Sequence, residues 1–143
     1  MSKKNNMNKK SIVSHEDLVA NLKHLIKSID DYKGKWLEDR STKNENGIDY
    51  YLWNAPITFE AMKFLYDNNL LIDFDWSHWD EGRELYKKDD PNKYNLLDIE
   101  WVLKLLTAVA RNDRFNEGAW AALFDSGDAQ KLFARLLEIE ESI

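Results

Sequence analysis

The stretch Asp98–Ile143, DIEWVLKLLTAVARNDRFNEGAWAALFDSGDAQKLFARLLEIEESI, decides the fold of this chain. Its apolar residues recur three and four positions apart over 99–109 and again over 132–137, a spacing typical of the buried face of an amphipathic helix. Asp98 or Asn95 can cap the first of these helices with a side-chain oxygen. The stretch therefore predicts a pair of helices that pack through their apolar faces.

A polar corner at 111–116 follows the first of these two helices. After the corner, residues 119–124 are apolar enough for a short buried helix, and Gly127 is placed to end it. Asp128 then stands where the last helix begins, because a carboxylate is favoured at a helix N-terminus. The C-terminal third therefore predicts three helices of unequal length.

The same helical spacing occurs near the N-terminus. Ser14 precedes a run of leucines and isoleucines three and four positions apart, and Asp17 lies three residues after it, as in a capping box. The run ends near Tyr32, ahead of Gly34. We expect the first ordered helix to begin at Ser14 and to end close to Tyr32.

Residues 35–54 are the least regular part of the chain. Apolar and polar residues alternate over 48–52, directly after Asn46-Gly47, a pair that favours a tight turn between two strands. The polar run 41–47 is longer than the two-residue loops that hairpins favour. A short β ribbon and an extended loop are therefore both compatible with this segment.

A second helix is expected after Pro56, a residue suited to the first turn of a helix because its missing N–H would have no partner there. Thr58 can cap this helix, and apolar residues continue at helical spacing to Tyr66. Asn68-Asn69 can end it, because asparagine tolerates the left-handed conformation common after helices.

An alternation of apolar and acidic residues follows over 70–76, which predicts a short extended segment packed on one side. Ser77 and Asp80 then repeat the capping-box spacing ahead of a third helix over 78–88. Asp89-Asp90-Pro91 breaks this helix.

Together these elements predict a mainly α fold. We expect a single compact domain of five or six helices over 14–143, with at most a small β ribbon or extended loop between the first two helices. Residues 1–13 carry lysines, asparagines and serines without an acid, a composition typical of a disordered basic tail. One domain is also the usual organisation for a chain of 143 residues.

The net charge of the chain is −6, and the tail holds four lysines, so the rest carries −10. Phosphate repels so acidic a body, and we do not expect its folded surface to bind nucleic acid directly. The chain has no cysteine, and it lacks the run of roughly 18 to 20 apolar residues that a membrane helix needs. We therefore expect a cytoplasmic protein without a membrane contact.

Arg111, Asp113, Arg114 and Glu117 form the densest polar cluster of the sequence. Two guanidiniums at a helix corner can bind an anion, with Asp113 or Glu117 as a general base. Alternatively, the two arginines pair with neighbouring acids and hold the corner in place. Residue spacing does not decide between these interpretations.

Trp76 and Trp79 stand among Asp73, Asp75 and His78. Paired indoles in an acidic frame suit a cationic ligand or a basic protein partner, although packing in the core is the commoner role of tryptophan. The acids and the histidine do not match the spacing of a known metal loop, and no nucleophile or phosphate-binding motif occurs. We therefore predict no metal ion, no cofactor and no catalytic residue.

The segment Leu105–Gly118, LLTAVARNDRFNEG, precedes a short helix, Ser126-Gly127 and a leucine-rich last helix. It resembles an uncharacterised family of small bacterial proteins with a domain of unknown function. Phe74-Asp75-Trp76 with Trp79, and Leu65-Tyr66, are similar to the middle region of that family. The resemblance covers most of 18–137 and singles out the string Arg-x-Asp-Arg-Phe-x-Glu-Gly. Because the family has no assigned activity, the resemblance implies no function.

These features favour a non-enzymatic binding or regulatory module that contacts another protein. One alternative is an enzyme or ligand-binding protein for a phosphate- or carboxylate-bearing substrate at the Arg111–Glu117 corner. A second alternative is an acidic inhibitor from a phage or mobile element that mimics the charge of nucleic acid. The lack of a catalytic motif favours the first interpretation.

Overall fold

A computed structural model of the chain describes residues 14–143; the expected disordered tail, 1–13, lies outside the described residues. The described part contains six α-helices, one 3-10 turn (η1) and four short strands. In chain order these are α2 (His15–Asp31), β1 (Leu37–Asp39), β2 (Thr42–Asn44), β3 (Gly47–Asp49), β4 (Leu52–Asn54), α3 (Pro56–Asp67), η1 (Trp76–His78), α4 (Asp80–Lys87), α5 (Ile99–Asn112), α6 (Ala119–Asp125) and α7 (Asp128–Glu141).

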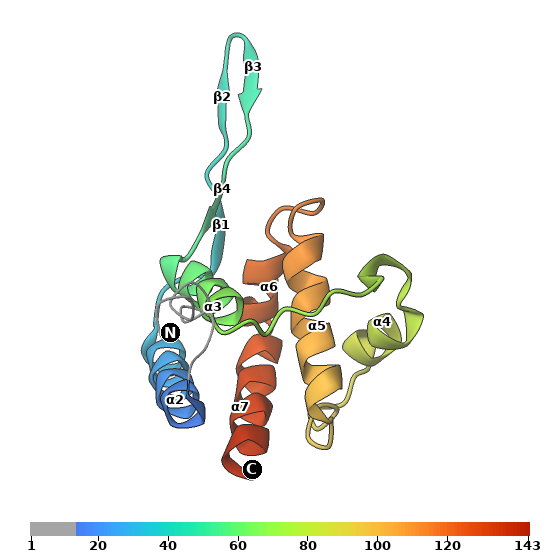
Figure 1. Cartoon of the computed structure of the whole chain (residues 1–143). Helices are drawn as coiled ribbons and strands as arrows, with labels where there is room; N and C mark the ends of the chain where they lie inside the picture. The colour runs from blue at the N-terminus through green and yellow to red at the C-terminus, as the bar shows by residue number, and fades with distance from the viewer. Residues whose placement is uncertain (1–13) are drawn as a thin grey trace, which may run out of the picture.

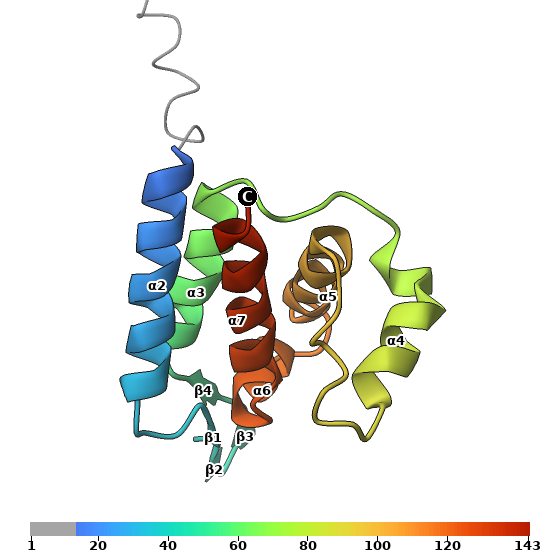
Figure 2. The same cartoon turned by 90° about the horizontal axis from the view of Figure 1, so that it is seen from below.

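One hydrophobic core joins the helices and confirms the mainly α fold. Helices α2 and α3 lie on one side of α5 and α7, and α4 lies on the other side (Figures 1 and 2). Fully buried side chains from five helices meet in the centre, and each contributes on the order of 1.5–3 kcal/mol through burial. They include Leu22, Leu65, Leu106, Leu123 and Phe133. None of the helices formed by residues 14–143 is long and apolar enough to cross a membrane.

Helix caps place the ends of α2 and α5 as the sequence indicates. Ser14 Oγ accepts a hydrogen bond of 3.1 Å from the N–H of Asp17, which confirms the start of the first helix. Asp98, rather than Asn95, caps α5, since its carboxylate accepts the N–H of Trp101 at 2.9 Å. Both caps satisfy N–H groups that have no partner within their helix.

The start of α3 differs from the expectation in one respect. Ala55 is its N-cap residue and Pro56 begins the helix, but Thr58 lies inside the first turn. The buried hydroxyl of Thr58 donates 2.7 Å back to the carbonyl of Ala55 and does not accept an N–H as a cap would. The prediction of Thr58 as the cap was therefore wrong, whereas Asn69 ends the helix region in the predicted left-handed conformation, with φ +56°.

The third predicted helix also begins later than expected. Ser77 belongs to the η1 turn, and its hydroxyl bonds to Asp75 at 3.1 Å instead of capping α4. Trp79 occupies the N-cap position and supplies no side-chain hydrogen bond. Upstream, Ile72, Phe74 and Trp76 are half-buried and alternate with exposed acids, so the segment packs on one side as predicted, although it forms no strand.

Residues 37–54 form a β ribbon, which resolves the choice left open by the sequence. β1 pairs antiparallel with β4, and β2 with β3, so that Asn44 faces Gly47 across a two-residue turn. Gly47 has φ +126°, a conformation that glycine adopts without strain. The β2–β3 end of the ribbon projects away from the helices (Figure 1).

Candidate functional site

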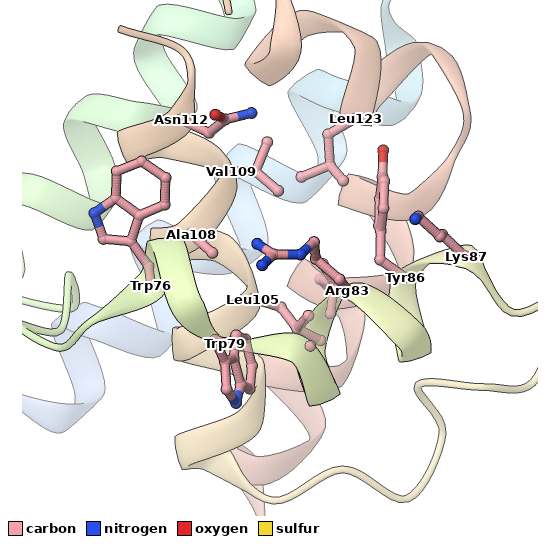
Figure 3. A pocket seen from close by; sticks show the side chains of 12 residues that line it. Trp76, Trp79, Arg83, Tyr86, Lys87, Leu105, Ala108, Val109, Asn112 and Leu123 are labelled. Carbon is pink, nitrogen blue, oxygen red and sulfur yellow. The ribbon is translucent and has the colours of Figure 1, made fainter. Parts of the chain in front are cut away.

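A cavity of about 320 Å³ lies between α4 and α5 (Figure 3). Its floor is apolar and comes from three helices: α5, α6 and α7. The floor residues are Leu105, Ala108, Val109, Leu123 and Leu132. The volume falls at the lower end of the range of about 300–1,000 Å³ that is typical of small-molecule sites.

Helix α4 leaves this space open because of the side chains that it turns toward α5. Its only buried residue is Gly82, and its other residues on the cavity are Arg83, Tyr86 and Lys87. A helix that packs on a core normally presents leucines at this spacing. Arg83, Tyr86 and Lys87 are instead long, exposed side chains with polar ends, and they do not fill the space between α4 and α5.

Trp79 forms one wall of the cavity, and Gly82 allows it to lie close to α4. A Cβ atom at position 82 would overlap the indole ring of Trp79. The same indole contacts Trp101, with ring centroids 4.9 Å apart, and meets the edge of Phe74 at 5.3 Å. The Trp79 wall is therefore held by aromatic contacts on several sides.

Trp76 forms a second wall of the cavity (Figure 3). Its ring stacks on Phe115, with centroids 6.1 Å apart, and Phe115 is 79 % exposed. The main chain that leads to Trp76 is attached to α5 because the N–H of Ile72 donates 3.0 Å to the buried hydroxyl of Thr107. The structure therefore brings Trp76 and Trp79, both selected from the sequence, to one cavity.

The charged groups on the cavity are both cationic. The guanidinium of Arg83 donates to the carbonyl of Ser77 at 3.1 and 3.2 Å and to Asp80 at 3.0 Å, so its charge is shared. Lys87 forms no ion pair with any residue of 14–143. No aspartate or glutamate of the described part of the chain lines the cavity.

The Arg111–Glu117 corner does not contribute its charged side chains to this cavity; only Asn112 lines it. Asp113 instead accepts the main-chain N–H groups of Gly118, at 3.1 Å, and Trp120, at 3.0 Å. Within the described chain, Arg111 and Arg114 take part in no ion pair. The corner is therefore held by Asp113 and not by the arginine pairs that the structural alternative required.

The same corner supports the base of the ribbon. Gly118 is buried, has φ +94° and begins α6. A Cβ atom there would lie 3.3 Å from Leu37 on β1 and 3.5 Å from Leu52 on β4. Arg114 and Glu117, by contrast, are exposed. The string singled out by the resemblance thus joins α5, α6 and the ribbon.

The acidic segment beside the tryptophans holds one local pair. His78 Nδ1 lies 3.0 Å from Asp75, and hydrogen bonds from His78 and Ser77 lower the pKa of the Asp75 carboxyl. Both side chains are exposed. No group of three histidine, aspartate or glutamate side chains in the described chain is placed to hold a metal ion.

The ribbon carries a second candidate surface. Ile48, Tyr50 and Tyr51 are 46 %, 83 % and 54 % exposed, and every residue of β2 and β3 is exposed. Exposed large apolar groups on a projecting element are typical of protein contact sites. At the opposite end of the ribbon, by contrast, the residues of β1 and β4 are half-buried, except for the exposed Asp39.

Arg83, Lys87 and the ribbon side chains were missed by sequence reasoning. The segment DEGRELYK reads as an exposed helix with mixed charges, and nothing local reveals which face meets α5. Gly82 was a usable signal, because a glycine inside a helix costs about 0.5–1 kcal/mol and therefore indicates a close contact.

Comparison with known proteins identifies the family of the chain. No curated protein and no solved structure matches it. Residues 13–142 match a family of unknown function, DUF6508, and the match covers nearly all of the chain. The expectation of an uncharacterised family is thereby confirmed, while the role of the Arg111–Gly118 string as its marker stays a prediction. The chain belongs to DUF6508, a family of unknown function.

Proposed function

We propose that this protein is a non-enzymatic binding module that contacts another protein through its β ribbon. The observation that carries the proposal is the exposure of Ile48, Tyr50 and Tyr51 on a ribbon that projects beyond the helices (Figure 1). Tyrosine is enriched in protein interfaces because it combines a large apolar ring with a hydroxyl that can pair with the partner. Two unpaired strand edges can in addition accept a strand from the partner.

The charge of the ribbon favours a basic partner. Residues 37–54 hold four acids and two cations, in a chain whose net charge is −6. Hydrogen bonds from Arg40 and Lys35 lower the pKa of Glu38, and hydrogen bonds from Ser41 lower that of Asp39, so both carboxylates are charged at neutral pH. A partner with surface lysines or arginines would complement this potential.

The two alternative functions receive less support. At the Arg111–Glu117 corner, Arg111 is half-buried and Arg114 is exposed, and neither lines the cavity between α4 and α5. The Asp113 carboxylate already accepts two N–H groups, which leaves it poorly suited to act as a general base. A mimic of nucleic acid needs a continuous acidic face. Several acids instead pair with cations one helical turn away, as Lys27 does with Asp31 and Lys104 with Glu100.

Site-specific photo-cross-linking in the cells that make the protein tests the proposal. A photoreactive phenylalanine analogue replaces Tyr50 in one strain and Tyr66, a tyrosine of α3 that is 72 % exposed, in a matched control. We expect position 50 to cross-link one defined protein and position 66 to leave it unlinked. With that protein purified, Tyr50→Ser combined with Tyr51→Ser should weaken binding by about tenfold or more.

Equal cross-linking from positions 50 and 66, or none from position 50, would overturn the ribbon as the contact surface. An unchanged affinity of the Tyr50→Ser, Tyr51→Ser variant would do the same. Circular dichroism should show that the helices persist in this variant, because both side chains are exposed and make no core contact.

A further inference from the structure

We propose that the cavity between α4 and α5 binds a small organic anion, with an apolar body against the indole rings and a carboxylate directed to Lys87. This site lies apart from the ribbon and does not depend on the protein-binding function. Its support comes from the charge, the shape and the construction of the cavity (Figure 3).

The charge of the lining is opposite to that of the chain. Among residues 14–143, Arg83 and Lys87 are the only charged residues that line the cavity, although the chain carries a net charge of −6. Helix α4 also contains Asp80, Glu81 and Glu84, and none of the three lines the cavity. Arg83 and Lys87 therefore border the cavity, whereas the acids of the same short helix do not, and both cations also remain exposed to water.

Lys87 is the cation left for a ligand. Arg83 already donates to Ser77 and Asp80, whereas the ammonium of Lys87 forms no ion pair within the described chain. A carboxylate at this position would meet one point charge at the edge of an apolar surface, where water screens the attraction less than it does on the open surface. A single carboxylate therefore fits better than a multiply charged phosphate.

The remaining lining selects an apolar body. Leu105, Ala108 and Val109 of α5 form part of the apolar floor, and the Trp76 and Trp79 indoles provide the walls. Flat rings stack favourably on indole, and the volume of about 320 Å³ suits a molecule of the size of a bicyclic aromatic acid. Asn112 and the hydroxyl of Tyr86 offer further polar contacts at the rim.

The test measures binding of naphthalene-2-acetate to the purified full-length protein by isothermal titration calorimetry, beside its uncharged amide. We expect the acid to bind at least about fivefold more tightly than the amide, since only the acid gains the interaction with Lys87. Lys87→Gln should weaken binding of the acid about tenfold and leave the affinity for the amide unchanged. Lys131→Gln removes the same charge from an exposed position of α7 and is the matched control. It should change neither the affinity for the acid nor the affinity for the amide.

A second variant tests the place of binding without loss of the fold. Ala108→Leu adds side-chain volume into the empty cavity, so the melting temperature should stay the same or rise while both ligands are excluded. Absence of binding by the wild type at millimolar acid would overturn the proposal. Equal affinities for acid and amide, or unchanged binding by Ala108→Leu, would also overturn it.

Discussion

The carboxylate of Asp113 accepts a hydrogen bond of 3.0 Å from the main-chain N–H of Trp120, the second residue of α6. The same oxygen accepts the N–H of Gly118 at 3.1 Å. Gly118 is the N-cap residue of α6 and has no side chain with which to satisfy these groups. The preceding helix therefore supplies the cap for the next one, and a single acid holds the corner together.

Asp113→Ala should lower the free energy of unfolding by about 1–2 kcal/mol, because two partly buried N–H groups lose their acceptor. Asp113→Asn keeps an acceptor oxygen and should cost less. Urea denaturation measures both. The control is Arg114→Ala, whose side chain is exposed and forms no ion pair in the described chain, and whose effect should stay within about 0.5 kcal/mol. A larger loss for Arg114→Ala than for Asp113→Ala would contradict this account of the corner.

Two glycines with nearly the same backbone conformation allow the cost of backbone strain to be measured separately from the cost of a steric contact. Gly118 and Gly127 have φ +94° and +88°, and both precede a helix. A Cβ atom on Gly127 would meet nothing within 4 Å, whereas one on Gly118 would lie 3.3 Å from Leu37. Gly127→Ala should therefore cost about 1–2 kcal/mol from backbone strain alone, and Gly118→Ala should cost more.

The comparison is made by thermal and urea unfolding of the two single variants. The variant Gly118→Ala, Leu37→Ala supplies the double-mutant test, because shortening Leu37 makes room for the added methyl group. A smaller added cost of Gly118→Ala in the Leu37→Ala background is the expected result. An equal loss of stability from Gly118→Ala in both backgrounds would show that Leu37 at the base of the ribbon does not restrict the space at position 118.

Helices could be predicted from the sequence where their caps and apolar spacing depend only on residues a few positions apart. Ser14 and Asp98 cap their helices through residues three positions ahead, and the apolar spacing of α5 and α7 is readable without knowledge of the fold. Thr58 and Ser77 have the residue type of a cap but use their hydroxyls otherwise. A propensity for capping is a weak signal when other acceptors lie nearby.

The cavity could not be predicted, because it depends on contacts between distant segments. Whether Arg83 and Lys87 face α5 or water is decided by how the 70–79 segment returns to α5, and Thr107 lies 35 residues from its partner Ile72. The indole N–H of Trp120 likewise donates 2.7 Å to the carbonyl of Thr58, 62 residues away. Trp76 and Trp79 were selected by residue type, but their common cavity follows only from this packing.

Thr107→Val should lower stability by about 1–2 kcal/mol, because it preserves side-chain shape but leaves the N–H of Ile72 without its acceptor. Thr58→Val is the matched control at an equally buried threonine. Its hydroxyl donates to a carbonyl that also accepts the main-chain N–H of Thr58, so less should be lost. Unfolding in urea measures both, and an equal or larger cost for Thr58→Val would contradict the role of Thr107.

The burial of Tyr94 leads us to expect that the protein loses stability in alkaline solution. The Tyr94 side chain is buried beside the carboxylate of Asp128, and no hydrogen bond of its hydroxyl to residues 14–143 has standard geometry. Burial, and the nearby negative charge of Asp128, raise the pKa of Tyr94 above its ordinary value near 10. Tyr86 shows the same direction for the same causes, burial first and Asp128 second.

The sign follows from the raised pKa. Below about pH 10, Tyr94 is neutral in both the folded and the unfolded chain, so its burial costs no ionisation energy. Above about pH 10, Tyr94 ionises in the unfolded chain, while the folded chain retains the proton. The free energy of unfolding should therefore fall from pH 10 upward, by at most about 1.4 kcal/mol per pH unit for this group. Tyr94→Phe should reduce that slope, because it removes the ionising hydroxyl. Urea denaturation from pH 8 to 11 measures this dependence of stability on pH. Tyr66→Phe, at an exposed tyrosine, is the control. An equal reduction of the slope by both variants would show that Tyr94 is not the group responsible.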